Sequence, residues 1–231
     1  MDVGLLIADR VLPEFESIGG QYIDMFSRFL PDLKLSPYYV CDNEFPNRVD
    51  QHEAYICTGS KYSVYDDINW INNLRAFVKN IHDENIRFVG ICFGHQMMAE
   101  ATGGKVKKAD SGWAIGVHEL SMHSTETWTV PIADQLNVLM LCQDQVHHLP
   151  PNSRILASFP DCRVGMFMIG SNMLGIQGHP EFSKEYNEAL FKSRIAAIGE
   201  EKVQKAQKII SKNLSNETIG AWVTSFVRLK K

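Results

Sequence analysis

Cys92 lies where a buried strand is predicted to turn into a helix. Residues 88–91, Phe-Val-Gly-Ile, form a short apolar run of the kind that suits a strand covered on both faces. Residues 95–101 are good or moderate helix formers, and the helix is expected to end at Gly103 and Gly104. The thiol of Cys92 is therefore expected at a corner between a strand and a helix.

Two glycines flank Cys92 at equal spacing. The pattern Gly90-x-Cys92-x-Gly94 has the form of a nucleophile elbow, a strained turn in which small neighbours let one side chain project above a sheet. The amides that open the following helix favour a thiolate over a thiol. The alternative is a buried, inert thiol, since free cysteine is among the most buried residue types. Because that alternative does not account for a glycine on each side, we interpret Cys92 as a candidate nucleophile.

A candidate base for this nucleophile lies in residues 173–182. This stretch is predicted to be a strand running into His179, and regular pairing should stop at Pro180, which has no N–H to donate. Side chains two residues apart in an extended chain point to the same side. Glu181 can thus bind one ring nitrogen of His179 while the other faces Cys92, which fixes the tautomer of a general base. A His-Pro-Glu tripeptide also occurs in ordinary turns, but combined with the elbow it indicates a catalytic set.

The two motifs together resemble those of a known family. The stretches GICFGHQ and GIQGHPE are similar to the motifs of the class I glutamine amidotransferases, whose Cys-His-Glu glutaminase domains release ammonia from glutamine. The resemblance runs from the first predicted strand to about Phe182. It is strongest to the free-standing branch related to the amidotransferase domain of guanylate synthetase, which includes γ-glutamyl peptidases. Three further segments support that branch: residues 58–67, 112–117 and 143–146.

The resemblance implies a role for several residues. Cys92 would be the nucleophile, His179 the general base and acid, and Glu181 the carboxylate that orients the histidine. The backbone amides of Gly59 and Phe93 would bind the oxyanion, and a glycine just past a strand terminus permits such an approach. Three further residues would help to bind the substrate: Gln96 and, further along the chain, Gln143 and Asp144.

The sequence departs from the family pattern at two places. Relatives often have histidine where this chain has Cys142, and an aromatic residue where it has Gly178. Glycine at 178 could widen the pocket on the leaving-group side, or it could allow close packing of strands. Trp113 could be a wall of the pocket or a core aromatic. The pair His147-His148 is expected in a surface loop, because no second cluster with the spacing of metal ligands accompanies it.

Composition excludes several classes of function. The formal net charge of −4 argues against nucleic acid or an anionic membrane as a partner, because both require basic surface. The N-terminus lacks the basic region of a signal peptide, and its apolar run is too short to span a bilayer. Five cysteines without regular spacing predict neither a disulfide framework nor a metal site, so a cytoplasmic location is expected. No cofactor is expected, and no P-loop of the form GxxxxGK[ST] is present.

Alternating strands and helices predict an α/β fold, a doubly wound, mostly parallel sheet flanked by helices, with a flavodoxin-like arrangement. Ligands bind beyond the carboxyl ends of the strands in such sheets. Gly59, Cys92 and His179 are all expected at strand ends. The predicted strands up to Cys92 are residues 1–9, 34–41, 54–57 and 88–91, and the predicted helices are residues 17–30 and 67–82.

A β-rich excursion is predicted to interrupt this pattern between residues 105 and 178 before the chain returns to deliver His179. Its expected strands are residues 115–122, 127–130, 138–142, 154–159, 164–169 and 174–177. Three helices are expected after Glu181, at residues 183–198, 200–212 and 216–229. The whole chain, residues 1–231, is predicted to be a single domain with a C-terminal helical extension over about 183–231.

Three functions fit these observations. The first is a glutaminase-type amidotransferase, a cysteine-dependent hydrolase acting on the γ-amide of glutamine. The second is a γ-glutamyl peptidase, which uses the same chemistry on a larger small-molecule substrate. The third is a non-enzymatic module that binds a metabolite or senses redox state through Cys92, which would also require a resolving cysteine nearby. An amidotransferase normally supplies ammonia to a synthetase, so either a separate synthetase partner exists or the protein works alone.

Overall fold

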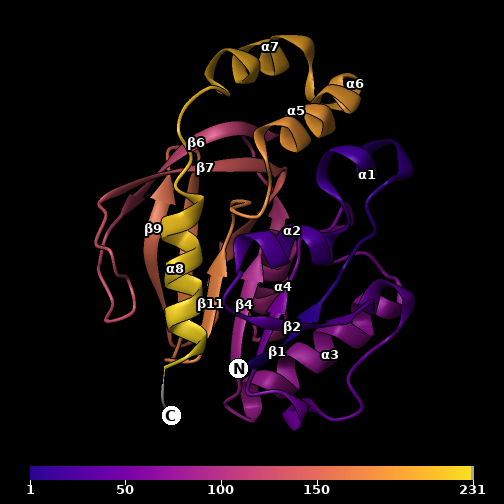
Figure 1. Cartoon of the computed structure of the whole chain (residues 1–231), viewed down its shortest axis with the longest axis vertical. Coiled ribbons are helices and arrows are strands. Elements are labelled where there is room, and N and C mark those ends of the chain that lie inside the picture. The colour runs from indigo at the N-terminus through magenta and orange to yellow at the C-terminus, as the bar shows by residue number, and fades with distance from the viewer. Residues whose placement is uncertain (230–231) are drawn as a thin grey trace.

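The computed structural model describes residues 1–229, in which a nine-stranded sheet carries helices on both faces (Figure 1). Five neighbouring strands are parallel, and the other four continue the sheet in antiparallel pairing. This confirms the predicted α/β fold, and the antiparallel part is the predicted β-rich excursion. The spatial order is β2 (Lys34–Tyr38), β1 (Asp2–Leu6), β3 (Ala54–Cys57), β4 (Arg87–Ile91), β11 (Met173–Ile176), β10 (Cys162–Ile169), β9 (Ser153–Phe159), β6 (Ala114–Met122) and β7 (Gln135–Cys142).

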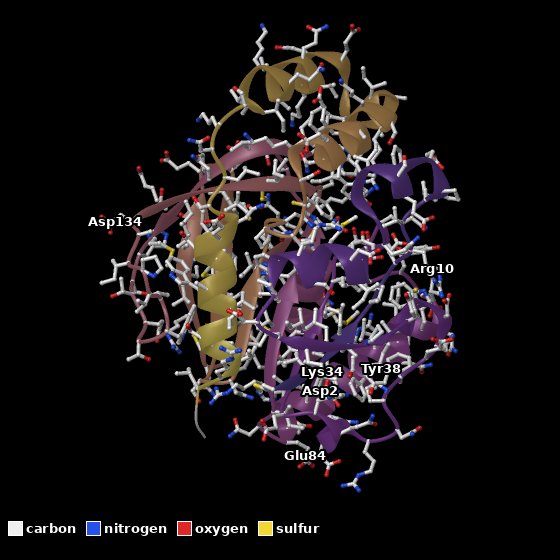
Figure 2. The ribbon with its side chains drawn as sticks, in the orientation of Figure 1. Asp2, Arg10, Lys34, Tyr38, Glu84 and Asp134 are labelled. Atoms are coloured by element: carbon white, nitrogen blue, oxygen red, sulfur yellow. The ribbon has the colours of Figure 1, made fainter. Side chains whose placement is uncertain are left out.

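The central parallel strands are buried on both faces, as their mostly apolar sequences require. Every residue of β3, β4 and β11 is buried. The outer strand β2 is more exposed, and its first residue, Lys34, forms an ion pair with Asp2 of β1 at 3.0 Å (Figure 2). The centre of the sheet, which carries the site, is therefore the best-shielded part of the fold.

Two cores lie on opposite faces of the sheet. Leu5 belongs to one cluster and Leu6 to the other, because successive side chains of a strand point to opposite faces. On the face of Leu5, the helices α2 (Tyr22–Phe29) and α8 (Asn216–Val227) supply Phe26 and Trp222. On the other face, α3 (Asn69–Asp83) and α4 (Phe93–Ala101) pack on the sheet and on each other. Figure 1 shows α8 and α3 covering different parts of the sheet.

Some predicted helices are divided in the structure. The helix expected over residues 17–30 is two helices, α1 (Pro13–Gly19) and α2, separated at Gly20 with φ of 74°. The Gln21 and Asp24 side chains cap the start of α2 in a capping box. The helix expected over 183–198 is likewise split into α5 (Lys184–Ser193) and α6 (Ile195–Ile198), followed by α7 (Glu200–Ile209). Residues 230–231, the end of the predicted extension, lie outside the described part.

The excursion also differs from the prediction in two places. Residues 127–130 are not a strand, and the turn there is closed by Thr129, whose hydroxyl donates to the Glu126 carbonyl at 2.8 Å. A separate two-stranded sheet, formed by β5 (Lys105–Lys108) and β8 (Asp144–His148), was not predicted. The loop predicted for His147-His148 was therefore wrong, since both residues belong to β8.

Short 3-10 helices η1 (Val40–Asp42) and η2 (Val49–Gln51) complete the described elements. None of the helices within residues 1–229 is both long enough and apolar enough to cross a membrane.

The carboxyl ends of β4 and β11 point toward α1 and α5, at the top of Figure 1. The two strands are parallel neighbours with Gly90 opposite Gly175, and the Cys92 amide continues the pairing by donating to the Ile176 carbonyl at 2.8 Å. Strand β11 ends at Ile176, earlier than expected. His179 lies beyond the end of β11 and donates its amide to the Leu139 carbonyl of β7 at 2.7 Å. His179 is thereby placed beside Cys92, above the carboxyl ends of the central strands.

Candidate active site

Cys92 occupies a strained corner between β4 and α4. Its backbone has φ of 50° and ψ of −99°, a conformation that residues with a side chain rarely adopt. A Cβ on Gly90 would lie 2.3 Å from the carbonyl carbon of Gly94, and a Cβ on Gly94 would lie 2.5 Å from the carbonyl oxygen of Cys57. Both flanking glycines are therefore sterically required, which is the packing that a nucleophile elbow predicts.

His179 and Glu181 form a buried pair beside this corner. The Nδ1 atom of His179 and the Oε1 atom of Glu181 are 2.7 Å apart, and the Glu181 side chain is fully buried. The imidazole also stacks on Phe182, with ring centroids 4.1 Å apart and planes 6° from parallel. Contacts on two sides thus restrict the ring to one orientation, as an orienting carboxylate does in a triad.

Charge near His179 favours its protonated form. Burial alone would lower the pKa of His179, but the negative charges of Cys92 and Glu181 and hydrogen bonds to both outweigh burial and raise it to about 10. The surroundings of His179 therefore favour an imidazolium beside the Glu181 carboxylate. A cation next to Cys92 suits a thiol nucleophile, because the thiolate is the reactive species.

Gly59 lies between the candidate nucleophile and base. A Cβ on Gly59 would be 2.8 Å from Cε1 of His179 and 3.7 Å from Cβ of Cys92. The buried Thr58 hydroxyl donates to the Gly59 carbonyl and accepts from the Ala8 amide, both at 3.0 Å, so this loop is fixed to the end of β1. Phe93 is the first residue of α4, and its amide is among those that a helix leaves without an intrahelical partner. The backbone at 59 and 93 thus flanks Cys92 as an oxyanion site requires.

Two adjoining cavities open beside the pair. The Cys92 cavity encloses about 640 Å³, including space open to solvent, and its walls include Cys92, Gln96, Trp113, Gln143 and Asp144. The His179 cavity encloses about 470 Å³ on the same basis and is lined by His179 and by residues of α1 and α5. Ser60, Lys61, Leu141 and Arg194 line both cavities. A substrate held across them would pass between the nucleophile and the base.

The remaining residues expected at the site line the Cys92 cavity. The Asp144 carboxylate accepts hydrogen bonds from Ser63 at 2.5 Å and Tyr65 at 2.9 Å, so it holds the loop that follows Gly59. Gln96 donates its amide to the Asp144 carbonyl at 2.8 Å. Gln143 lines the cavity beside them. The structure therefore brings Gln143 and Asp144 next to Cys92, with Asp144 already occupied by two hydroxyl groups.

Gln177 was not predicted as part of the site. Its side-chain amide nitrogen lies 3.6 Å from Sγ of Cys92, within hydrogen-bonding range for sulfur, and its oxygen accepts from Gln96 at 3.3 Å. The residue is fully buried. Gln177 can thus donate a hydrogen bond to a Cys92 thiolate. Its place in the GIQGHPE motif was the only sequence signal, since the contact depends on the pairing of β4 with β11.

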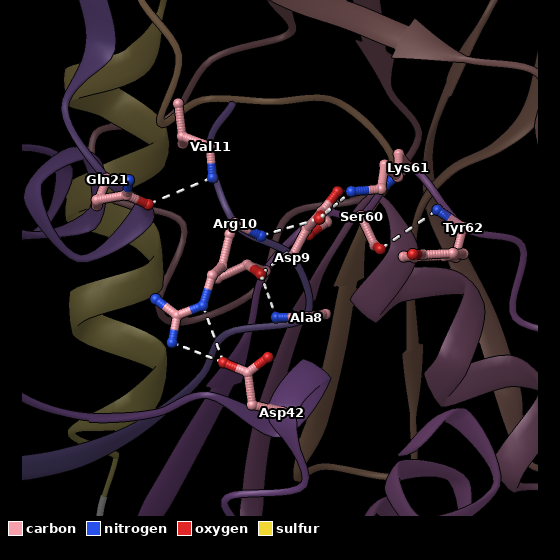
Figure 3. Close-up of polar contacts among 11 residues, drawn as sticks. Ala8, Asp9, Arg10, Val11, Gln21, Asp42, Ser60, Lys61 and Tyr62 are labelled. Carbon is pink, nitrogen blue, oxygen red and sulfur yellow. Dashed lines mark hydrogen bonds and ion pairs between the residues drawn. The ribbon is translucent and has the colours of Figure 1, made fainter. Parts of the chain in front are cut away.

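The loop after Gly59 is tied to the loop after β1. Lys61 donates its backbone amide and its Nζ atom to the two carboxylate oxygens of Asp9, each at 3.0 Å (Figure 3). The Ser60 hydroxyl accepts from the Tyr62 amide at 3.3 Å. These contacts fix the segment that forms the wall between the two cavities.

The residues that depart from the family pattern, Gly178 and Cys142, have defined surroundings in the structure, as does Trp113. A Cβ on Gly178 would lie 2.5 Å from Cγ1 of Val138, so glycine allows close packing on β7 and does not widen a pocket. Trp113 lines the Cys92 cavity and also packs on the core. Cys142 lies in the wall of the same cavity. No cluster of potential metal ligands occurs among residues 1–229, and the rings of His147 and His148 pack edge to face with centroids 4.6 Å apart.

The fold and the site together place the protein among cysteine-dependent hydrolases. More particularly, the chain belongs to the class-I glutamine amidotransferase family. The sequence model of that family matches residues 49–197, which is more than half of this chain. Among solved structures, a glutamine amidotransferase from Thermotoga maritima superposes with a TM-score of 0.76 at 18% identity, covering 98% of this chain and 99% of that one. This likeness concerns the fold alone.

Relatives of this chain include γ-glutamyl peptidases and a subunit of a synthase. Gamma-glutamyl peptidase 4 of Arabidopsis thaliana is 32% identical over 72% of this chain and 70% of its own length. Gamma-glutamyl peptidase 3 of the same plant is 31% identical over 64% of this chain and 63% of its own length. A glutamine-hydrolysing GMP synthase subunit of Saccharolobus solfataricus is 28% identical over 71% of this chain and 85% of its own length. The family is thus established, and its members differ in what they act upon.

Proposed function

We propose that the protein hydrolyses the amide bond at the γ-carbonyl of a γ-glutamyl compound through a thioester on Cys92. The observation that carries the proposal is the buried His179–Glu181 pair beside a cysteine on a strained elbow. In this mechanism the thiolate attacks the γ-carbonyl, and the amides of Gly59 and Phe93 bind the oxyanion. His179 gives its proton to the departing amine. It then takes a proton from water, which cleaves the thioester and releases glutamate.

The substrate that we favour is a γ-glutamyl peptide. Two observations support it. The relatives at 32% and 31% identity are named γ-glutamyl peptidases. The His179 cavity also leaves space for a group larger than ammonia on the side where the base lies. A peptide leaving group would use that space, whereas the ammonia released from glutamine would not.

A second candidate is the glutaminase component of a synthetase. Similarity to the GMP synthase subunit supports it, since a separate glutamine-hydrolysing chain is named there. The catalytic residues are the same for both substrates, so the two candidates differ only in what binds beyond the γ-carbonyl. A preference for glutamine, increased by a co-purifying protein, would favour this candidate over the peptidase.

A redox-sensing module is less well supported. Cys142 lines the cavity of Cys92 and could act as a resolving cysteine. Burial and, to a smaller extent, the neighbouring Cys92 raise the pKa of the Cys142 thiol well above its ordinary value. A cysteine that stays protonated is a poor nucleophile toward an oxidised partner. The position of Cys142 therefore favours a structural role.

The proposal is tested by measuring amine release from glutamine, γ-glutamyl dipeptides and glutathione, with wild-type protein and the Cys92→Ala variant. Wild-type protein should turn over at least one of these compounds, and Cys92→Ala should turn over none. Labelling by a diazo-ketone analogue of glutamine should be lost in Cys92→Ala and retained in Cys41→Ala, a control at a half-buried cysteine elsewhere. Labelling that persists in Cys92→Ala would refute the assignment of the nucleophile.

A further inference from the structure

The His179 cavity lies where the leaving group of the proposed reaction must bind. The residues lining it include His179, whereas the residues lining the Cys92 cavity include Cys92. The attacked carbonyl must contact Cys92, and the departing nitrogen must reach His179 to receive a proton. If the proposed function holds, the glutamyl part therefore fills the Cys92 cavity, and the departing amine extends into the His179 cavity.

One part of the wall of the His179 cavity is apolar, although charged residues line the cavity as well. Leu12 and Phe15, from the start of α1, face Tyr186 and Leu190 of α5 across it. Leu12 is 45% exposed, which is unusual for a leucine next to a buried aromatic cluster, whereas Phe15 and Leu190 are buried. A ligand with an apolar side chain would cover Leu12 and remove this surface from water. The cavity is smaller than the Cys92 cavity, which favours a short side chain over a bulky aromatic one.

Most of the charges around the His179 cavity are already neutralised. Asp9 is paired with Lys61 at 3.0 Å, and the Arg10 guanidinium turns away to bind Asp42 at 2.8 and 2.6 Å (Figure 3). Arg194 differs from both. Its guanidinium lies over the Trp113 ring at 5.9 Å, and no carboxylate within residues 1–229 forms an ion pair with it.

Arg194 lies at the junction of two helices, where it is the C-cap of α5 and the N-cap of α6, and it lines both the Cys92 cavity and the His179 cavity. A guanidinium binds carboxylates through paired N–H groups, so a cation without a partner in a ligand-sized cavity is suited to an anionic ligand. An amino acid that leaves from a γ-glutamyl peptide carries such an anion, its own α-carboxylate.

We propose that the His179 cavity is a leaving-group subsite for small apolar amino acids with a free carboxylate, and that Arg194 binds that carboxylate. The inference rests on the proposed function and specifies its substrate class as γ-glutamyl derivatives of residues such as valine. In the reaction, the C–N bond of the γ-amide breaks and a C–S bond to Cys92 forms. The proton of His179 passes to the departing nitrogen, so the amino acid leaves as the neutral amine. Water then cleaves the thioester.

The test compares γ-glutamylvaline with γ-glutamylvaline amide, in which the carboxylate is neutral and the rest is unchanged. For wild-type protein, kcat/KM should be at least about tenfold higher for the free acid, as a charge-assisted pair contributes. In Arg194→Gln, the ratio of the two values should fall toward one, and Arg194→Lys should restore part of it. The control Lys192→Gln removes a positive charge from the exposed side of the same helix, where Lys192 pairs with Glu188, and should leave the ratio unchanged.

A second comparison tests the apolar wall. Wild-type protein should prefer γ-glutamylvaline to γ-glutamylglycine by several-fold, and Leu12→Asp should reduce or reverse this preference. Equal turnover of the free acid and the amide by wild-type protein would overturn the proposal. So would an equal loss of glutamine and peptide hydrolysis in Arg194→Gln, because Arg194 would then bind the carboxylate of the glutamyl part.

A binding measurement separates this inference from the proposed function. Titration calorimetry with Cys92→Ala should give tighter binding of γ-glutamylvaline than of its amide, by about tenfold, and the additional change Arg194→Gln should abolish the difference. If wild-type protein turns over none of the compounds while Cys92→Ala still binds γ-glutamylvaline more tightly than its amide, only the proposed function is refuted. Equal binding of the two ligands would refute the role of Arg194, whatever the turnover.

Discussion

Replacing Glu181 by glutamine tests how much the buried pair contributes to reactivity. Glutamine has nearly the shape of glutamate, so its oxygen can still accept from Nδ1 of His179 at about the present distance of 2.7 Å. The change removes the negative charge that stabilises the imidazolium. It also places an amide N–H near the position of Oε2, which has no hydrogen-bond partner among residues 1–229. The variant should therefore fold but be impaired in both catalysis and stability.

The size of each effect follows from the interaction that the substitution weakens. A hydrogen bond to a charged group contributes about 1.5–3 kcal/mol, which corresponds to a loss in kcat/KM of roughly 10-fold to 150-fold. If the amide turns its N–H toward the ring and imposes the wrong tautomer, the loss should approach about 10⁴-fold. An unsatisfied buried amide should lower the free energy of unfolding by about 1–3 kcal/mol.

Replacing Glu181 by glutamine should also lower the pH at which His179 loses its proton. The pKa of His179 is raised to about 10 from 6.5 by the surrounding anions against the effect of burial, so its charge adds stability that is fully present below about pH 6.5 and is lost as pH rises through 10. Without Glu181 the pKa of His179 should fall, and this stability should be lost at lower pH. Unfolding in urea at several pH values measures the shift.

The assays are kcat/KM for a γ-glutamyl peptide and the pH dependence of Cys92 alkylation by iodoacetamide. Glu185→Gln is a matched control, since Glu185 is exposed in the first turn of α5 and should tolerate the same change. In Glu181→Gln, turnover should fall and the pH range of rapid alkylation should change, while the control should resemble wild type. Unchanged turnover and alkylation in Glu181→Gln would remove Glu181 from the mechanism.

Two further predictions concern the elbow and the helix that follows it. Because the φ of 50° at Cys92 strains any residue with a Cβ, Cys92→Gly should be more stable to urea than Cys92→Ala by about 1 kcal/mol or more, and equal stabilities would contradict the strain. Burial lowers the pKa of His95 to about 3 against an opposing contribution from the Gly175 backbone, so protonation in the unfolded state should cost about 2 kcal/mol of stability as pH falls from 7 to 5. His95→Met should remove that loss, and urea unfolding at both pH values would reveal an equal loss in the variant if the reasoning is wrong.

Much of the geometry of the candidate site was predicted from sequence because its patterns are local. The steric need for Gly90 and Gly94 arises within one turn, between a strand and the helix that it enters. The contact between His179 and Glu181 was also predicted and joins residues only two apart, although the chain makes a turn at Pro180 and Glu181 where an extended backbone was expected. The alternation of apolar strands and helices predicted the parallel centre of the sheet for a similar reason, since each crossover joins neighbouring elements.

The errors in element boundaries arose where tertiary contacts outweigh local preference. Residues 127–130 have strand-forming residues, yet a hydroxyl of Thr129 closes a turn there. The lysine-rich strand β5 shows little strand signal, and it exists because β8 pairs with it. Apolar spacing continues across Gly20 without a break, although the chain needs a positive φ there to pack α1 and α2 in different directions.

The selectivity of the site could not be predicted from the sequence, because it depends on which distant segments of the chain come into contact. Gln177 and Cys92 are 85 positions apart and come together only through the parallel pairing of β4 with β11. Arg194 follows the end of α5, and its guanidinium lies over the Trp113 ring in the wall of the cavities. No local sequence pattern specifies this arrangement. A nucleophile elbow is encoded in a few consecutive residues by sterics, whereas a binding pocket is formed by side chains from several elements and exists only after the sheet has assembled.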